Sequence, residues 1–75
     1  MSDRASIGER IGATVRARRE ELGLTQVELA ELAGCSTRFV HTVEAAKPSL
    51  RLDKLADVLE VLGLDLVVVG PGSEP

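Results

Sequence analysis

The stretch LTQVELAELAGCSTRFVHTVE, residues 24–44, predicts two short helices joined by a tight turn. Thr25 and Glu28 have the spacing of a capping box, in which each side chain accepts a hydrogen bond from the other residue's backbone amide. Gly34 stands where helices commonly end in a left-handed residue, and Ser36 can cap the helix that follows. Two helices separated by a three-residue turn have the spacing of a helix-turn-helix unit.

The second helix of this unit, expected over about 37–45, has one apolar and one polar face. Its apolar residues recur at helical spacing and should face the core, which turns the polar side chains outward. The inward set is Phe39, Val40 and Val43, and the outward set is Thr37, Arg38, His41, Thr42 and Ala45. The alternative reading of the outward set is an ordinary solvated helix face.

The flanking sequence predicts two more helices and a strand. One helix is expected over about 6–22 and another over about 52–62, because apolar residues recur there at helical spacing. Residues 64–69, LDLVVV, are rich in β-branched side chains and lie between glycines, which is typical of a strand. We expect one domain over 1–70 and a flexible tail over 71–75.

Composition limits the class of protein. A chain of 75 residues with 44% hydrophobic and 28% charged residues is typical of one small globular domain. The single cysteine, Cys35, excludes an internal disulfide and favours a reducing cytoplasm. No apolar run has the length of a signal peptide or a membrane span. No metal-ligand spacing, phosphate-binding loop or catalytic arrangement is found, so we expect no enzyme, no cofactor and no metal site.

Two features predict a partner subunit. The helix at 52–62 has an apolar stripe that Val58 and Val61 widen, so more than one side of the helix must be buried. The stripe consists of Leu52, Leu55, Ala56 and Leu59. A lone strand also leaves backbone donors and acceptors without partners. A twofold homodimer that pairs the two strands meets both needs. The alternative is that residues 64–69 pack along their own domain as an extended segment.

The run RARREELGLTQVELAELAGCSTRFVHTVEAAKPSL resembles the lambda-repressor-like, or XRE-type, DNA-binding family, with its GLTQxELA helix and G-x-S turn. The continuation KPSLRLDKLADVLEVLGLDLVVV is similar to the HipB-type antitoxins. The resemblance covers about 6–69. It implies an all-α, lambda-repressor-like helix-turn-helix bundle of four to five helices, with a C-terminal β-strand that pairs across a homodimer.

The resemblance implies that the second helix of the unit enters the major groove of DNA. Arg38 is then the best base reader, since a guanidinium can bond guanine O6 and N7 together. Thr37 and Thr42 are expected to bond base edges or touch a thymine methyl, and His41 to reach a base or a phosphate. Gln26 matches a family residue that contacts a phosphate, and Lys47 and Ser36 are further expected contacts, with capping the safer role for Ser36.

The resemblance also implies a structural role for Arg19. Family members place a buried Arg–Glu pair between the first helix and the end of the third, and Arg19 and Glu44 match those positions. Arg16 and Arg18 are expected to be solvated, with a phosphate contact as the alternative. The family commonly has a glycine where this chain has Ala46, so Ala46 is expected either to adopt a left-handed turn at some cost or to let the helix end differently.

The net charge of -3 does not exclude a DNA-binding face, because charge is uneven along the chain. Residues 10–51 hold seven basic and five acidic side chains, whereas 52–75 hold one basic and five acidic. DNA responds to the local face, so a mildly basic face can bind it, and dimerisation would double the contacts.

Three functions remain open. The leading hypothesis is a cytoplasmic, nucleoid-associated homodimeric repressor of a palindromic operator, acting as the HipB-like antitoxin of a toxin–antitoxin pair with a HipA-like kinase as one possible toxin. The second is a stand-alone phage-type or host regulator. The third is a protein-interaction module of the same fold that has lost DNA binding.

Overall fold

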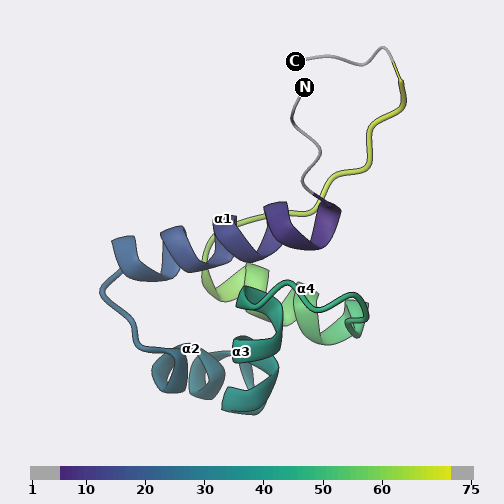
Figure 1. The fold of residues 1–75 in the computed structure, drawn as a ribbon. Helices are drawn as coiled ribbons and strands as arrows, with labels where there is room; N and C mark the ends of the chain where they lie inside the picture. The colour runs from purple at the N-terminus through teal and green to yellow at the C-terminus, as the bar shows by residue number, and fades with distance from the viewer. Residues whose placement is uncertain (1–5, 72–75) are drawn as a thin grey trace.

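The computed structural model describes residues 6–71, which form four helices and no strand. The helices are α1 (Ile7–Glu21), α2 (Gln26–Ala33), α3 (Thr37–Glu44) and α4 (Leu52–Val61). α1 packs on α3, and α2 packs on both α3 and α4 (Figure 1). The predicted all-α bundle is therefore confirmed, with four helices. Each helix boundary lies within about one residue of its expected position. Side-chain caps at Ser6, Thr25 and Ser36 start the first three helices, whereas Arg51 makes no side-chain cap bond at α4.

The caps explain where the helices begin. The predicted box at α2 is present, with the Glu28 amide 3.0 Å from Thr25 Oγ1 and the Thr25 amide 2.9 Å from Glu28 Oε1. A second box, which the sequence analysis missed, joins Ser6 and Glu9 at the start of α1. Each box satisfies two backbone groups that a helix start leaves without partners.

The core is aliphatic and draws on all four helices. Nine residues form it, namely Val15, Leu29, Ala30, Val40, Val43, Leu55, Val58, Leu59 and Leu62. Phe39, predicted to face inward, is half-buried and packs against this cluster. Gly12 is also buried, at the place where α1 crosses the end of α3. The core thus holds α3 rigidly under α1, which fixes how α3 presents its other face.

In the link from α3 to α4, the structure shows the first of the two outcomes expected at Ala46. Ala46 has a φ of 59°, in the left-handed region that glycine normally fills. The Ala46 amide donates to Val43 O at 3.1 Å and the Lys47 amide donates to Thr42 O at 3.3 Å. These bonds close the end of α3 and direct the chain toward α4.

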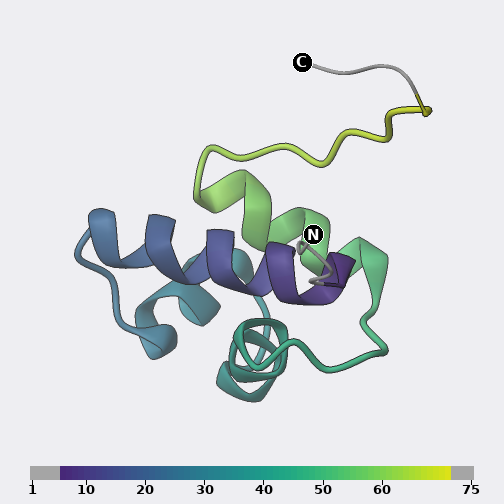
Figure 2. The ribbon, with the colours of Figure 1, turned by 45° about the horizontal axis from the view of Figure 1, so that its top comes forward.

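The predicted strand at 64–69 is absent from the described chain. Residues 64–70 form an extended segment that runs from α4 back along α1 and then leaves the helical body (Figures 1 and 2). A strand needs hydrogen bonds from a neighbouring strand, and no segment of residues 6–71 supplies one. Of the predicted tail, 71–75, all but Pro71 lies outside the described residues.

An apolar groove lies between this segment and the helices. Its walls come from the start of α1, from α4 and from the segment itself, and include Ile7, Ile11, Leu52, Leu66 and Val68. Val68 is 92% exposed and Leu52 is 65% exposed. The wide apolar stripe predicted for α4 is therefore only partly covered within one chain.

Candidate nucleic-acid interface

The α2–turn–α3 unit has well-defined backbone geometry. Gly34 has φ 72° and ψ 31°, and the following Cys35 amide donates to Ala30 O at 3.0 Å, which closes the end of α2. The Ser36 side chain then accepts from the Phe39 amide at 3.0 Å and starts α3. The turn therefore has fixed geometry at both ends, and the angle between the two helices is set by local hydrogen bonds as well as by the core.

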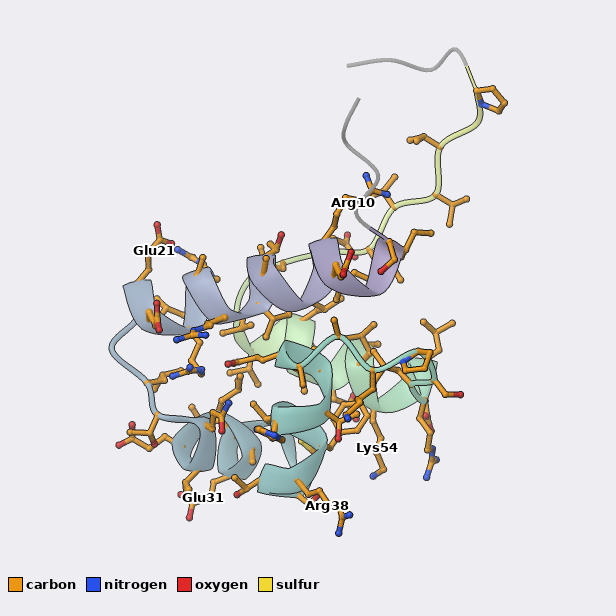
Figure 3. All side chains as sticks on the ribbon, viewed as in Figure 1. Arg10, Glu21, Glu31, Arg38 and Lys54 are labelled. Atoms are coloured by element: carbon orange, nitrogen blue, oxygen red, sulfur yellow. The ribbon has the colours of Figure 1, made fainter. Side chains whose placement is uncertain are left out.

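α3 exposes the polar face that the sequence predicted. Val40 and Val43 are fully buried, whereas Thr37, Arg38 and His41 are exposed. Arg38 projects away from the helical body (Figure 3), and no ion pair or side-chain hydrogen bond holds its guanidinium within residues 6–71. A guanidinium in this setting is available to a ligand.

The two hydroxyl side chains at the edges of α3 are partly engaged. Thr42 is half-buried and its Oγ1 donates to Arg38 O at 2.9 Å, which leaves its oxygen free only as an acceptor. Ser36 Oγ accepts from the Phe39 amide, so its own hydroxyl hydrogen remains available as a donor. Capping is therefore an observed role of Ser36, and its second role depends on that hydrogen.

Gln26 and Lys47 occupy two different elements beside α3. Gln26 is the first residue of α2, and its Nε2 donates to Glu44 Oε1 at 3.1 Å. Lys47 is exposed on the link between α3 and α4. The structure thus brings Gln26 against the end of α3 and leaves the Lys47 ammonium in solvent.

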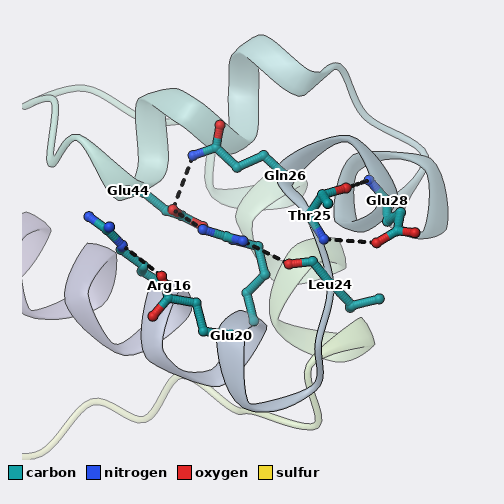
Figure 4. Close-up of polar contacts among 8 residues, drawn as sticks. Arg16, Glu20, Leu24, Thr25, Gln26, Glu28 and Glu44 are labelled. Atoms are coloured by element: carbon teal, nitrogen blue, oxygen red, sulfur yellow. Dashed lines mark hydrogen bonds and ion pairs between the residues drawn. The ribbon is translucent and has the colours of Figure 1, made fainter.

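The Arg–Glu pair implied by the family resemblance is present. Arg19 donates through Nε to Glu44 Oε2 at 2.7 Å and through Nη2 to Glu44 Oε1 at 3.1 Å, and its Nη1 donates to Leu24 O at 2.7 Å (Figure 4). The two side chains are 12% and 6% exposed. This bidentate pair joins α1 to α3 and satisfies both charged groups where water is scarce.

The surroundings shift the pKa values of both groups. Burial raises the pKa of the Glu44 carboxyl, but hydrogen bonds from Arg19 and Gln26 and the nearby charges of Arg19 and Arg16 lower it by more. The pKa of Glu44 in the folded protein is therefore below its ordinary value. The hydrogen bond to Glu44 raises the pKa of Arg19. Both groups stay charged at neutral pH, so the pair is permanent under ordinary conditions.

Two basic residues have surroundings that the sequence did not reveal. Arg18, expected to be solvated, donates through Nε to Leu62 O at 2.9 Å and so ties α1 to the end of α4. Lys54, counted with the acidic end of the chain, extends on the same side of the molecule as Arg38, whereas Arg10 lies on the opposite side (Figure 3). Charge counted along the sequence mixes residues of opposite faces, because it does not include how α1, α3 and α4 pack.

Outside the exposed face of α3, residues 6–71 hold one thiol of reduced reactivity, no metal-ligand cluster and no membrane-spanning helix. Cys35 is half-buried, and burial raises the pKa of its thiol, which makes it less nucleophilic. Among residues 6–71 no cluster of three His, Cys, Asp or Glu side chains could hold a metal ion. None of the described helices has the length and apolar character needed to cross a membrane.

A bundle that fixes a short helix after a tight turn, and leaves the polar face of that helix open, is the architecture of helix-turn-helix DNA-binding domains. A family model described as a helix-turn-helix domain matches residues 10–69. The uncharacterized HTH-type transcriptional regulator y4mF of Sinorhizobium fredii is 40% identical over 73 residues, which cover 97% of this chain and 96% of that protein. The chain belongs to the XRE-type helix-turn-helix family.

Solved structures agree with this assignment. The clp gene regulator ClgR from Corynebacterium glutamicum matches with a TM-score of 0.71 and 30% identity, over 80% of this chain and 64% of the ClgR chain. A chain of the HipA-HipB-O2-O3 complex matches with a TM-score of 0.77 over 92% of this chain and 97% of that chain. The identity to the latter is 19%, so the likeness is one of fold.

Proposed function

We propose that this protein is a sequence-specific transcriptional repressor that binds a palindromic operator as a homodimer. The observation that carries the proposal is the exposed polar face of α3, where Arg38 has no partner within the described residues. An exposed arginine on the second helix of such a unit suits a bidentate contact to guanine. Occupying an operator blocks transcription without any catalytic group, and the protein would act at the nucleoid in the cytoplasm.

Each polar residue of the interface has a proposed role. Arg38, Thr37 and His41 read base edges in the major groove, and Thr42 accepts a bond or touches a thymine methyl. Ser36, Gln26 and Lys47 contact the phosphate backbone, and Lys54 joins them because it lies on the same side as Arg38. Phosphate contacts position the domain, whereas base contacts give it specificity.

Homodimer formation is supported by the uncovered apolar segment after α4. Val67, Val68 and Val69 are 70%, 92% and 66% exposed. All three are β-branched residues, which favour strands. An exposed extended segment of this kind is a template for pairing with another chain. Pairing two copies about a twofold axis would give each segment a hydrogen-bonded neighbour and would cover the groove beside α1 and α4.

An antitoxin role is a narrower form of the same proposal. It is supported by the fold shared with a chain of the HipA-HipB-O2-O3 complex. In this form the protein represses its own operon and binds a toxin, with a HipA-like kinase as the candidate. Co-expression with the neighbouring gene tests it, because a toxin partner should copurify, and failure to recover any complex would reject the antitoxin role.

Two alternatives make different predictions. A stand-alone regulator, favoured by the 30% identity to ClgR, binds an operator and copurifies with no toxin. An interaction module without DNA binding is motivated by Ala45 and Ala46, which give the end of α3 no polar side chain, and by the acidic balance of the chain. Such a module enriches no DNA sequence.

Affinity selection on genomic DNA tests the proposed function. The purified protein, shown to be folded and dimeric, is mixed with sheared DNA from the organism that encodes it, at physiological salt. Sequencing of the retained fragments should recover a palindrome near a promoter, with half-sites about one helical turn apart. Retention of no enriched sequence would contradict sequence-specific binding and would support the interaction module.

A further inference from the structure

Three helices meet at the carboxylate of Glu44. Glu44 ends α3, Arg19 reaches it from α1, and Gln26 reaches it from the first residue of α2 (Figure 4). Glu44 Oε2 accepts from Arg19 Nε at 2.7 Å, and Oε1 accepts from both Arg19 Nη2 and Gln26 Nε2 at 3.1 Å. A single side chain therefore links the ion pair in the core to a residue at the edge of the interface.

The chemistry of Glu44 fixes the orientation of the Gln26 amide. An ionised carboxylate only accepts hydrogen bonds, so the nitrogen of the Gln26 amide must face it and the oxygen must face away. The ion pair with Arg19 keeps Glu44 ionised and immobile, because the two groups share two bonds and are largely buried. One N–H of Gln26 is engaged in this way, and the other has no partner within residues 6–71.

We propose that Glu44 is a positioning residue for DNA binding, which holds the Gln26 side chain so that its second N–H meets a backbone phosphate. This inference rests on the proposed function, since it assigns a phosphate contact to Gln26. A glutamine side chain that is already ordered loses less conformational freedom on binding than a mobile one. Glu44 itself does not touch DNA, because it is buried and carries the charge that a phosphate would repel.

A purely structural role makes a different prediction. If Glu44 only holds α1 against α3, its substitution lowers the stability of the domain and has the same effect on DNA affinity whether or not Gln26 is present. If Glu44 acts through Gln26, the two substitutions are coupled. A double-mutant cycle measures that coupling directly.

The cycle compares the wild type, Glu44→Gln, Gln26→Leu and the double variant on the selected operator, at several salt concentrations and with folding checked by circular dichroism. In Glu44→Gln the single amide oxygen accepts from Arg19, and the amide nitrogen cannot accept from Gln26, so the Gln26 amide is no longer held with its nitrogen toward residue 44. Made in the wild-type protein, Glu44→Gln should weaken operator binding on the order of fivefold. Made in the Gln26→Leu protein, the same substitution should have little further effect on operator binding. Gln26→Leu should also reduce the salt slope by about 1. Equal effects in both backgrounds would overturn the inference.

Glu20→Gln is the matched control. It breaks the ion pair between Arg16 and Glu20, which lies on α1 with its side chains 66% and 56% exposed. The same chemical change at this exposed pair should leave operator affinity and the coupling to Gln26 unchanged. A Glu20→Gln effect as large and as coupled as that of Glu44→Gln would show that any lost carboxylate gives the result, and would overturn the assignment to Glu44.

A second measurement uses the wild-type protein without DNA and holds even if Glu44→Gln does not fold. Nuclear magnetic relaxation of the Gln26 side-chain amide should report an ordered group, with an order parameter nearer to about 0.85 than to the values below about 0.6 that mark flexible groups. A freely rotating Gln26 amide in a protein that binds its operator would overturn the positioning role of Glu44 but not the proposed function. A wild type with an ordered Gln26 that enriches no DNA sequence would instead overturn the proposed function and the phosphate role that depends on it.

Discussion

Gly12 of α1 lies directly against the backbone of Val43 in α3, so that an ideal β-carbon at Gly12 would be 2.5 Å from the Val43 carbonyl oxygen and 3.2 Å from that of Glu44. The nearest atoms belong to the backbone and cannot move aside as a flexible side chain could. The absence of a side chain at Gly12 is thus what lets α1 approach the end of α3 closely enough for Arg19 to reach Glu44.

Substituting Gly12 should therefore destabilise the domain. We expect Gly12→Ala to lower the free energy of unfolding by about 1–3 kcal/mol, the range for an overpacked core, despite the better helix propensity of alanine. Chemical denaturation monitored by circular dichroism measures this change. Gly8→Ala in the same helix is the matched control, because a β-carbon there meets nothing nearer than 3.7 Å, and it should be neutral or stabilising. Equal losses in the two variants would contradict the role of the close approach.

Ala46 offers the opposite test, at a residue held in a left-handed conformation. Because this conformation costs an L-residue roughly 1–2 kcal/mol and glycine little, Ala46→Gly should raise the free energy of unfolding by about 0.5–1 kcal/mol, after allowing for the greater flexibility of glycine in the unfolded chain. Ala45→Gly is the control, since Ala45 has a φ of -81° and gains nothing from glycine. A thermal melt in which Ala46→Gly unfolds below the wild type would contradict this account.

The Arg19–Glu44 pair predicts a dependence of stability on pH. The pKa of Glu44 is lower in the folded protein than in the unfolded chain, so its contribution to stability is fully present above the unfolded pKa of about 4.3 and is lost as the pH falls through the folded value. Denaturation at a series of pH values should show stability falling on acidification below about 4.3. The decline should be shallower in Glu44→Gln, which has no proton to bind at this position. Identical slopes would show that Glu44 is not the group responsible.

The proposed homodimer places its contact on the exposed segment after α4. Val68→Lys should weaken self-association without reducing the helical content of the chain, because Val68 is 92% exposed and adds little to the core of one protomer. Sedimentation equilibrium over a range of concentrations measures this effect. Leu32→Lys is the control at another exposed apolar residue, 62% exposed on α2 and remote from the segment in sequence, and it should leave the association constant unchanged. Dimerisation that survives Val68→Lys would exclude this segment as its contact.

Much of the fold was predictable because it depends on local signals. Thr25 and Glu28 are three residues apart, and a capping box needs no information beyond that spacing. The faces of α3 follow from helical periodicity, which put Val40 and Val43 inside and Arg38 outside. The left-handed Ala46 was predictable from the place of a family glycine. Local rules suffice wherever the partner groups lie within one helical turn.

The features that the sequence did not reveal join distant residues. The sequence does not distinguish Arg18 from an ordinary surface arginine, because its hydrogen bond to Leu62 O joins residues 44 apart and depends on how α4 packs. The bond from Gln26 to Glu44 likewise depends on how α2 meets α3. The strand at 64–69 was predicted from composition, but a strand forms only with a neighbouring strand, and residues 6–71 provide none. Propensity describes a segment, whereas these contacts depend on the assembled fold.

The claim that α3 reads base edges is tested most directly by the affinity of Arg38→Ala for the selected operator and for a scrambled duplex of equal length, at several salt concentrations. We expect Arg38→Ala to lose about 1–3 kcal/mol on the operator and to relax specificity at one base pair, with much less change on the scrambled duplex. Lys47→Ala should instead weaken both duplexes alike and reduce the salt slope by about 1. An Arg38→Ala protein that discriminates the operator from the scrambled duplex as well as the wild type does would contradict the account.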